Sequence, residues 1–478
     1  MSSDQNSAGK NSFRLNRREF LVCSGVCAAG LAAFSPVGIA ALGENLPGNR
    51  KTRIRVVFGH PDPAQPNWPN IGYDFAGHIK TIQAALVAQC PEVEFLPVTT
   101  MSGQAEEAER ILQLDAEVDG YLVYLAGCLW GELTEKIATA GKPTIIADHL
   151  FAGSGEFLTS YARVKRAGHK VIGVSSSDIN DLVAAVRCLS ALTKLTQSRI
   201  LVVGREPDLN IEKVFGTKVK MVEFEEINTA YQQVNPAEAT KWAERWIQEA
   251  EKVIEPGREE IEKSARMYLA MKNLLKQQTA QAITVNCLGG VYSGKMVAAY
   301  PCLGFMQLDN DGLVGACEAD QRSTMTKLIM TYLVGRPGFI SDPVIDTAKN
   351  RIIYAHCVAS TRVFGPDGPA NPYHLRDHSE DRKGACNRSL MPIGEMTTTI
   401  QFDHNKKQVI LHQGKTVENV DEDKACRTKL AVEVKGDVYK LLEYWDQWGW
   451  HRVTFYGDLK RPVYNMAALL GFEVIEEA

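Results

Sequence analysis

The run Gly120-Tyr121-Leu122-Val123-Tyr124-Leu125 has the length, the apolar character and the aromatic and β-branched content of a buried strand. Similar strand-like runs lie at residues 54–59, 93–96 and 143–147. The segments between them have helical character, among them an acidic amphipathic stretch at residues 104–114. Because strands that alternate with helices form parallel pairs, this part of the chain predicts a parallel, doubly wound sheet.

The same alternation begins again further along the chain and then gives way to strands. Predicted strands lie at residues 170–174, 199–204 and 282–286, and predicted helices at residues 178–195, 237–253 and 258–278. From about residue 351 alternating strand patterns dominate, interrupted by a polar stretch at residues 365–387 that contains proline and glycine. We therefore expect two α/β domains, at residues 46–168 and 169–340, and a β-rich, antiparallel, barrel-like domain at residues 341–478.

Composition excludes several classes of protein. The 478 residues include 53 Lys and Arg against 57 Asp and Glu, a formal net charge of −4, and 45% of the residues are hydrophobic. This balance is ordinary for a globular protein and does not indicate a nucleic-acid partner. After the N-terminal region, no segment reaches the roughly 20 uninterrupted apolar residues of a membrane helix, so we expect no stable span in the mature protein.

The first 45 residues differ from the rest of the chain. Residues 16–21, with the sequence Asn-Arg-Arg-Glu-Phe-Leu, precede an apolar run rich in alanine and glycine that continues to about residue 41. This pattern predicts a twin-arginine export signal and linker, and a periplasmic or otherwise extracytoplasmic protein. A core helix or a retained membrane anchor is the weaker interpretation, because the run is rich in small residues and ends in plausible cleavage sites.

The cysteines do not indicate a disulfide framework. Two of the eleven, Cys23 and Cys27, lie in the predicted signal, and the remaining nine include no Cys-x-x-Cys pair. Six of the nine lie in apolar runs, where we expect buried free thiols. They are Cys128, Cys188, Cys287, Cys302, Cys317 and Cys357.

Two segments resemble known functional motifs but lack a feature that the motif requires. Residues 287–296 follow a predicted strand and nearly form a phosphate-binding P-loop, but Met296 stands where a hydroxyl must reach Mg²⁺. We interpret the segment as a glycine loop at the carboxyl end of a strand, where α/β domains bind ligands. His374 and His378 have helical spacing but lie in the polar stretch, which predicts a solvated loop. No nucleophile elbow, zinc helix or dinucleotide loop is present, so hydrolase and dehydrogenase functions lose support.

Two carboxylates and an imidazole are the strongest candidates for a site. Glu318 follows a segment of small and apolar residues. A charged side chain in such surroundings needs an oppositely charged partner or a metal ion. Asp342 comes 24 positions after Glu318. His451 follows a tryptophan-rich run. Taken singly, each carboxylate could equally be a helix cap or an ion-pair partner, and His451 a packed histidine. Taken together, two carboxylates and one imidazole are ligands that suit Mn²⁺ or Mg²⁺. Asp320 is predicted to cap the next helix, and His356 to lie in the core or behind the ligands.

Several segments resemble the L-fucose and L-arabinose isomerase superfamily, in particular its fucose-isomerase-like proteins. They are Pro301-Cys302-Leu303-Gly304-Phe305, Asp311-Gly312-Leu313, Ala316-Cys317-Glu318-Ala319-Asp320, Tyr332-Leu333-Val334-Gly335-Arg336-Pro337, Ser341-Asp342 and His451-Arg452-Val453-Thr454-Phe455-Tyr456-Gly457-Asp458. The similarity covers roughly residues 300–360 and 445–475. Before residue 290 it is architectural, and it implies two flavodoxin-like domains followed by a β-rich third.

The resemblance implies roles for these residues. Glu318, Asp342 and His451 would be the protein ligands of Mn²⁺ or another divalent metal, and the two carboxylates would also move protons between C1 and C2 of a sugar. His356 lies where the arabinose branch has a further ligating histidine, whereas an Asp at the second carboxylate position matches the fucose branch. The family also implies a homo-oligomer, a trimer or hexamer, whose sites are completed by a neighbouring subunit.

The sequence thus predicts a metal-dependent aldose–ketose isomerase acting on a free sugar. Because paired α/β domains also resemble periplasmic sugar-binding proteins, which need no metal, an exported sugar-binding protein without turnover is the alternative. A catalytically silent secreted protein is a third interpretation.

Overall fold

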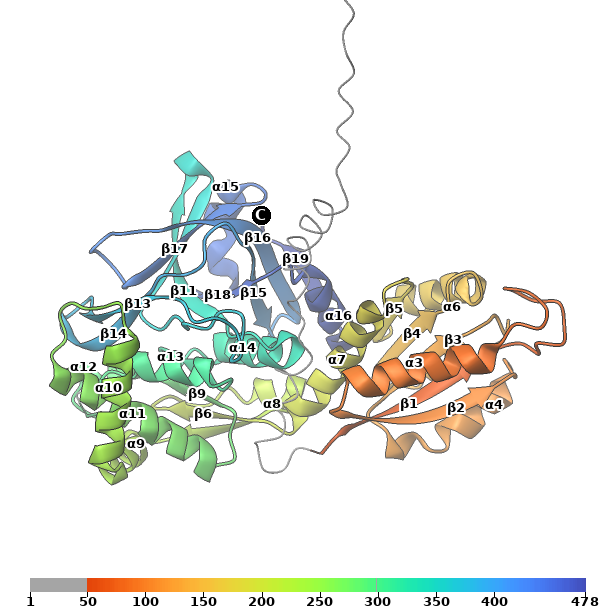
Figure 1. Cartoon of the computed structure of the whole chain (residues 1–478), viewed down its shortest axis with the longest axis horizontal. Helices are drawn as coiled ribbons and strands as arrows, with labels where there is room; N and C mark the ends of the chain where they lie inside the picture. The colour runs from red at the N-terminus through yellow and green to blue at the C-terminus, as the bar shows by residue number, and fades with distance from the viewer. Residues whose placement is uncertain (1–49, 298) are drawn as a thin grey trace, which may run out of the picture. The chain divides into compact units, whose positions relative to one another are not determined.

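The computed structural model describes residues 50–297 and 299–478 (Figure 1). The predicted twin-arginine signal lies outside the described residues, as do Cys23 and Cys27. Within the described ranges, no helix combines the length and the apolar character required to cross a membrane.

The first sheet has five parallel strands in the order β2-β1-β3-β4-β5. Its strands are β1 (Thr52–Gly59), β2 (Val93–Thr100), β3 (Gly120–Leu125), β4 (Thr144–Asp148) and β5 (Val171–Val174). The accompanying helices are α3 (Phe75–Gln89), α4 (Ala105–Leu112), η1 (Asp115–Glu117), α5 (Leu133–Thr139), α6 (Ser154–Arg166) and α7 (Ile179–Thr196). All six residues of β3 are buried, which confirms the predicted buried strand.

One strand belongs to a different sheet from the one predicted. The run at residues 170–174 was expected to open a second sheet, but β5 pairs with β4, with Ile172 opposite Ile145. The expected boundary at residue 168 therefore divides the hydrogen-bonded first sheet. The apolar run shows that residues 170–174 form a strand. Which strand β5 pairs with depends on the direction in which the preceding helix, α6, returns the chain to the sheet.

The second sheet has four parallel strands in the order β10-β9-β6-β7. They are β6 (Arg199–Val203), β7 (Lys218–Val222), β9 (Ala282–Val285) and β10 (Val314–Ala316). The helices of this region are α8 (Asn210–Phe215), α9 (Phe224–Gln233), α10 (Pro236–Glu249), α11 (Arg258–Gln277), α12 (Cys287–Tyr292), α13 (Cys302–Asn310) and α14 (Gln321–Val334). The carboxyl ends of β6, β9 and β10 meet at one edge, where ligands bind in sheets of this kind.

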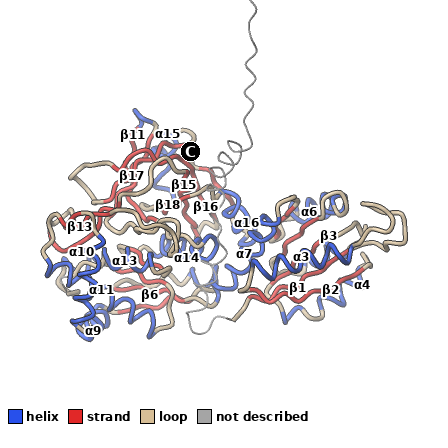
Figure 2. Tube along the Cα trace, viewed as in Figure 1, coloured by secondary structure: helices blue, strands red, loops and turns tan. Residues whose placement is uncertain are grey.

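The C-terminal region contains a closed antiparallel barrel, as predicted. Its six strands are hydrogen bonded in the order β15-β18-β11-β12-β17-β16, and β16 pairs with β15 to close the ring. Figure 2 labels five of these strands, β11, β15, β16, β17 and β18. They are β11 (Phe339–Asp346), β12 (Arg351–His356), β15 (Met396–Asp403), β16 (Gln408–Asn419), β17 (Thr428–Val434) and β18 (Arg452–Tyr456). The remaining elements are η2 (Thr347–Lys349), α15 (Val438–Tyr444), η3 (Trp445–Trp448), α16 (Lys460–Leu470) and β19 (Glu473–Glu476), which pairs with β16 in parallel.

The polar stretch at residues 365–387 is not the solvated loop that was predicted. It contains β13 (Tyr373–His378) and leads into β14 (Lys383–Ser389), and with β8 (Lys252–Val253) these strands form a small third sheet. His374 and His378 are buried in β13. Ladder hydrogen bonds satisfy the backbone, and an ion pair between Arg427 and Asp377 satisfies one of the buried charges, so polar residues are tolerated there.

The nine cysteines of the described residues are free thiols. Five of the six that were expected to be buried are buried, and the sixth, Cys128, is half-buried. Several of the buried thiols lie in the apolar core that also contains α11 and α13.

Candidate functional site

Three segments that are distant in sequence bring Glu318, Asp342 and His451 together. Glu318 lies in the loop between β10 and α14, Asp342 lies in β11, and His451 immediately precedes β18. Because β11 and β18 are paired, with Ser341 opposite Arg452, Asp342 and His451 are neighbours. Nε2 of His451 lies 3.2 Å from Oδ1 of Asp342 and 3.6 Å from Oε2 of Glu318.

The loop that carries Glu318 has an unusual backbone. Glu318 has φ 60° and the following Ala319 has φ 49°, the left-handed region that side chains with a Cβ rarely adopt. Such residues cost roughly 1–3 kcal/mol each and persist where the surrounding structure holds them. Here the amide of Ala319 donates a 2.9 Å hydrogen bond to the carbonyl of Val285 at the end of β9. The strain is thus located at the residue whose carboxylate faces the site.

Asp320 has two roles, only one of which was predicted. As expected it caps α14, because its Oδ1 accepts a hydrogen bond from the amide of Ser323 at 3.0 Å. Its Oδ2 also lies 2.9 Å from Nδ1 of His451. No local sequence pattern points to this second contact, since the residues are 131 positions apart.

The contact between Asp320 and His451 shifts the pKa of both groups. Burial alone would raise the pKa of Asp320, but the hydrogen bond to His451 outweighs it and lowers the pKa to about 2. Burial likewise acts to lower the pKa of His451, but the hydrogen bond to Asp320 and the nearby negative charge of Asp342 raise it to about 10. In the metal-free protein, His451 therefore holds a proton between two carboxylates.

Asp342 is fixed by further contacts. Its Oδ1 accepts a hydrogen bond from the indole nitrogen of Trp450 at 2.5 Å, and its Oδ2 lies 4.0 Å from Sγ of Cys426. Burial would raise the pKa of Asp342, but the positive charge of the nearby His451 and the indole donor of Trp450 lower it overall. The carboxylate is therefore ionised and held in one orientation.

His356, predicted to lie in the core or behind the ligands, reaches the same centre. It ends β12 and follows Ala355, which is opposite Asp342 in the ladder. The residue is only 3% exposed, and its Nε2 lies 3.7 Å from Oε1 of Glu318. Among the described residues, neither this Nε2 nor that of His451 has a hydrogen-bond partner. Because buried polar atoms are normally hydrogen bonded, two buried ring nitrogens without partners beside carboxylates indicate a ligand-binding site.

A cavity of about 540 Å³ opens onto Glu318 and His451, whereas Asp342 and His356 lie behind its lining. It is lined by Glu318, Asp320 and His451 and by side chains from the carboxyl ends of the second sheet and from the barrel. These further residues include Arg205, Asp208, Asn286, Leu288, Arg322, Gln401, His404, Trp448 and Trp450. Asn286 and Leu288 come from the end of β9 and the start of the near-P-loop segment, which lies on the ligand side of the sheet as expected.

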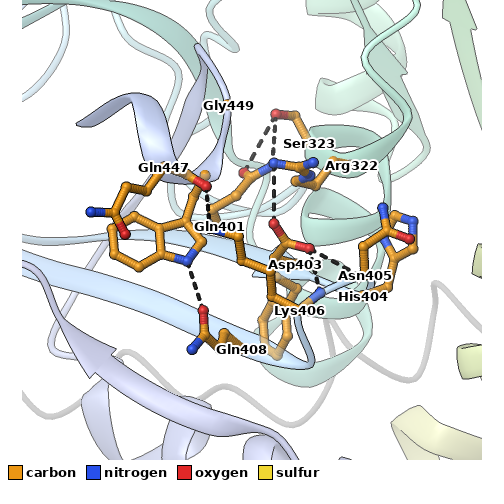
Figure 3. A network of polar contacts seen from close by, with 12 residues as sticks. Arg322, Ser323, Gln401, Asp403, His404, Asn405, Lys406, Gln408, Gln447 and Gly449 are labelled. Carbon is orange, nitrogen blue, oxygen red and sulfur yellow. Dashed lines mark hydrogen bonds and ion pairs between the residues drawn. The ribbon is translucent and has the colours of Figure 1, made fainter. Parts of the chain in front are cut away.

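A polar network holds the segment before His451 against the barrel (Figure 3). Asp403 forms an ion pair with Arg322 at 3.3 Å, and its Oδ1 accepts the amide of Lys406 at 3.0 Å. Nζ of Lys406 donates a 2.6 Å hydrogen bond to the carbonyl of Gln447. The indole of Trp448 is held by Gln408 at 2.9 Å. These contacts fix the turn from which His451 enters the site.

The donor set fits a hard divalent cation. Glu318 and Asp342 offer carboxylate oxygens, and His451 offers Nε2 once its other nitrogen has donated to Asp320. A histidine whose outer nitrogen is held by a carboxylate is the usual form of a metal-binding imidazole. Among the described residues, the groups of three whose ligand atoms all lie within 4.8 Å of one another are different ones: Asp342 with His356 and His451, and Cys317 with Glu318 and His356. The predicted set of Glu318, Asp342 and His451 therefore draws two residues from the first group and one from the second, joined through His451.

Comparison with known proteins gives distant relatives. The chain is 25% identical over 283 residues to the sulfoquinovose isomerase of Clostridium sp. (strain MSTE9), a match that covers 56% of this chain and 60% of that protein. It is 21% identical over 243 residues to the sulfoquinovose isomerases of Priestia aryabhattai and Priestia megaterium, covering 48% of this chain and 53% of each relative. No family model matches the chain. The chain thus matches a little over half the length of these relatives.

Proposed function

We propose that the protein is a metal-dependent aldose–ketose isomerase of the L-fucose and L-arabinose isomerase type, acting on a free sugar. The observation that carries the proposal is the convergence of Glu318 and Asp342 on the unpartnered Nε2 of His451. The similarity to sulfoquinovose isomerases supports the same reaction class. The alternative, an exported sugar-binding protein without turnover, does not account for two carboxylates beside a buried imidazole.

Glu318, Asp342 and His451 would hold the cation, Mn²⁺ or another divalent metal. When bound to neighbouring sugar oxygens, such an ion makes the C2 proton more acidic and stabilises the negative charge that develops. Asp320 fixes the His451 ring through Nδ1, which leaves the lone pair of Nε2 directed at the two carboxylates.

The two carboxylates would also move the protons of the reaction. One accepts the proton from C2 of the aldose and returns it to C1, while the other assists the transfer of the O2 proton to O1. No atom is gained or lost: the aldehyde carbon C1 becomes a hydroxymethyl group, and the hydroxyl-bearing carbon C2 becomes the ketone. Glu318, with its side chain 34% exposed, faces the cavity, and Asp342 is more enclosed at 26%.

The cavity also favours an anionic substituent on the sugar. Arg322 is paired with Asp403, and Asp208 with His404. Arg205, by contrast, has no carboxylate partner within 4.0 Å among the described residues, and its guanidinium lies 3.4 Å from the carbonyl of Ala319, beside Glu318. The relatives are named for a sulfo sugar, and a guanidinium is well suited to such a group. We include an anionic sugar among the proposed substrates.

Two further features belong to the proposal. We expect the protein to be exported by the twin-arginine route, which fractionation of the native cell would test. We also expect a homo-oligomer, a trimer or hexamer, which light scattering of the purified chain would test.

Metal analysis and a ketose assay test the main proposal. The purified chain should contain about one Mn²⁺ or similar ion and convert at least one of fucose, arabinose, rhamnose or sulfoquinovose, with turnover lost on chelation and restored by Mn²⁺. Glu318→Gln should lose metal and turnover, whereas Asp346→Asn, at the far end of β11, should keep both. If Glu318→Gln retains metal content and turnover, the assignment is wrong. Sugar binding that survives chelation without turnover favours the binding protein.

A further inference from the structure

The hydrogen bonds of His356 and His451 differ at Nδ1. Nδ1 of His451 faces the ionised Asp320 at 2.9 Å, so it must carry a proton and donate. Nδ1 of His356 instead lies 2.9 Å from the backbone amide nitrogen of Cys357, which can only donate. In His356, therefore, Nδ1 accepts through its lone pair.

The two rings consequently present different atoms to the centre. A neutral imidazole has one proton and one free lone pair. When a cation displaces the second proton of His451, Nδ1 keeps the proton that faces Asp320, and Nε2 presents the lone pair that binds the cation. With Nδ1 accepting, His356 presents Nε2–H, which can only donate. Distance alone permits His356 as a ligand, together with Asp342 and His451, but the hydrogen bond at Nδ1 opposes it.

The Nε2–H of His356 needs an acceptor that the described residues do not supply. The ring is 3% exposed, and the nearest carboxylate oxygen, Oε1 of Glu318, lies at 3.7 Å, beyond hydrogen-bond distance. A buried donor left without an acceptor destabilises the protein, so this donor is expected to meet an acceptor from a bound ligand. The donor lies beside Glu318 and Asp342, which is the position a reacting sugar oxygen would take in the proposed function.

We propose that His356 is not a metal ligand but a catalytic hydrogen-bond donor, whose Nε2–H binds the sugar oxygen that becomes negatively charged as the C2 proton is removed. The proposal rests on the isomerase function above. The donor is neutral and held in place by Cys357, so it stabilises the developing charge without rearrangement. This role also gives His356 a function in a site where Glu318, Asp342 and His451 already supply the three proposed ligands.

Metal content and turnover of three variants test this role. His356→Leu should keep the metal content and the metal affinity of the wild type and lose turnover by about 10²–10³-fold, the usual effect of removing one such donor. His356→Gln, whose amide nitrogen can replace Nε2–H, should recover part of the turnover. His451→Gln should lose the metal. If His356→Leu loses metal as His451→Gln does, His356 is a ligand and the proposal is wrong.

The tautomer supplies a readout that does not depend on activity. The ¹⁵N shift of Nε2 in His356 should be of the protonated type both before and after Mg²⁺ is added, a probe that avoids paramagnetic broadening. An unprotonated or metal-bound Nε2 overturns the proposal. A wild-type chain that neither binds metal nor converts any sugar overturns the proposed function itself, whereas an active wild type with metal-free His356→Leu overturns only the role of His356.

Discussion

Nδ1 of His451 lies 2.9 Å from Oδ2 of Asp320, although the two residues are 131 positions apart. The same carboxylate caps α14 through the amide of Ser323. One side chain therefore connects the strained loop after β10 to the residue that precedes β18. The orientation of His451 depends on where the second sheet places this loop.

Asp320→Asn should weaken metal binding by about 10–100-fold, the usual effect of changing the residue that supports a metal-binding histidine. The neutral amide still caps α14, since Asn is as good a capping residue as Asp, but it no longer fixes the protonated Nδ1 of His451. Isothermal titration with Mn²⁺ measures the change. Asp437→Asn is the matched control, because Asp437 caps α15 by the same kind of contact. Equal affinities for wild type and Asp320→Asn would contradict the role of Asp320.

Metal binding should also depend on pH. Burial opposes the charged form of His451, but Asp320 and Asp342 raise its pKa to about 10, so the free protein holds a proton that the metal must displace. Between about pH 7 and pH 10 each unit increase should therefore strengthen binding about tenfold, and the dependence should level off above the pKa. Titrations in buffers of different ionisation enthalpy should show one proton released per ion at pH 8. Binding without proton release in that range would show that His451 is not the ligand.

The fold was largely predictable, and the site only in part. Apolar runs separated by helices identify parallel sheets, and alternating patterns identify the barrel, because both follow from local periodicity. The same periodicity could not assign β5 to the first sheet, nor show that the polar residues of β13 are buried, since both depend on which distant segment packs there. Glu318, Asp342 and His451 were selected as candidates from segments that resemble a family, and the structure places them side by side; their roles remain predictions. The contact between Asp320 and His451 and the positive φ of Glu318 exist only in three dimensions.

A buried ion pair supports the strand that leads to Glu318. Nζ of Lys327 lies 2.6 Å from Oδ2 of Asp309, both side chains are 1% exposed, and Oδ1 of Asp309 accepts the amide of Gly315 in β10. Removing one partner leaves an unpaired buried charge, so Asp309→Asn should lower the free energy of unfolding by about 3–5 kcal/mol. Urea denaturation measures it.

The effect should depend on burial. The double variant Asp309→Leu with Lys327→Met should recover most of the loss, because apolar residues can replace a buried pair. Glu249→Gln, which breaks an exposed pair with Arg245, should change stability by less than about 1 kcal/mol. Similar losses in Asp309→Asn and Glu249→Gln would show that the buried pair has no special role in holding β10.

Arg205→Met should discriminate between anionic and neutral sugars. A hydrogen bond between a guanidinium and an anionic group contributes about 1.5–3 kcal/mol, so the KM for sulfoquinovose should rise about 10–100-fold, while the KM for a neutral aldose changes by less than about threefold. The kcat values should change little, because the contact is made equally in the ground and transition states. Arg166→Met, which removes an exposed arginine of α6, is the control. If the KM rises equally for both sugars, or for neither, the guanidinium of Arg205 does not select the substrate. An anionic group would then be bound by other residues of the cavity.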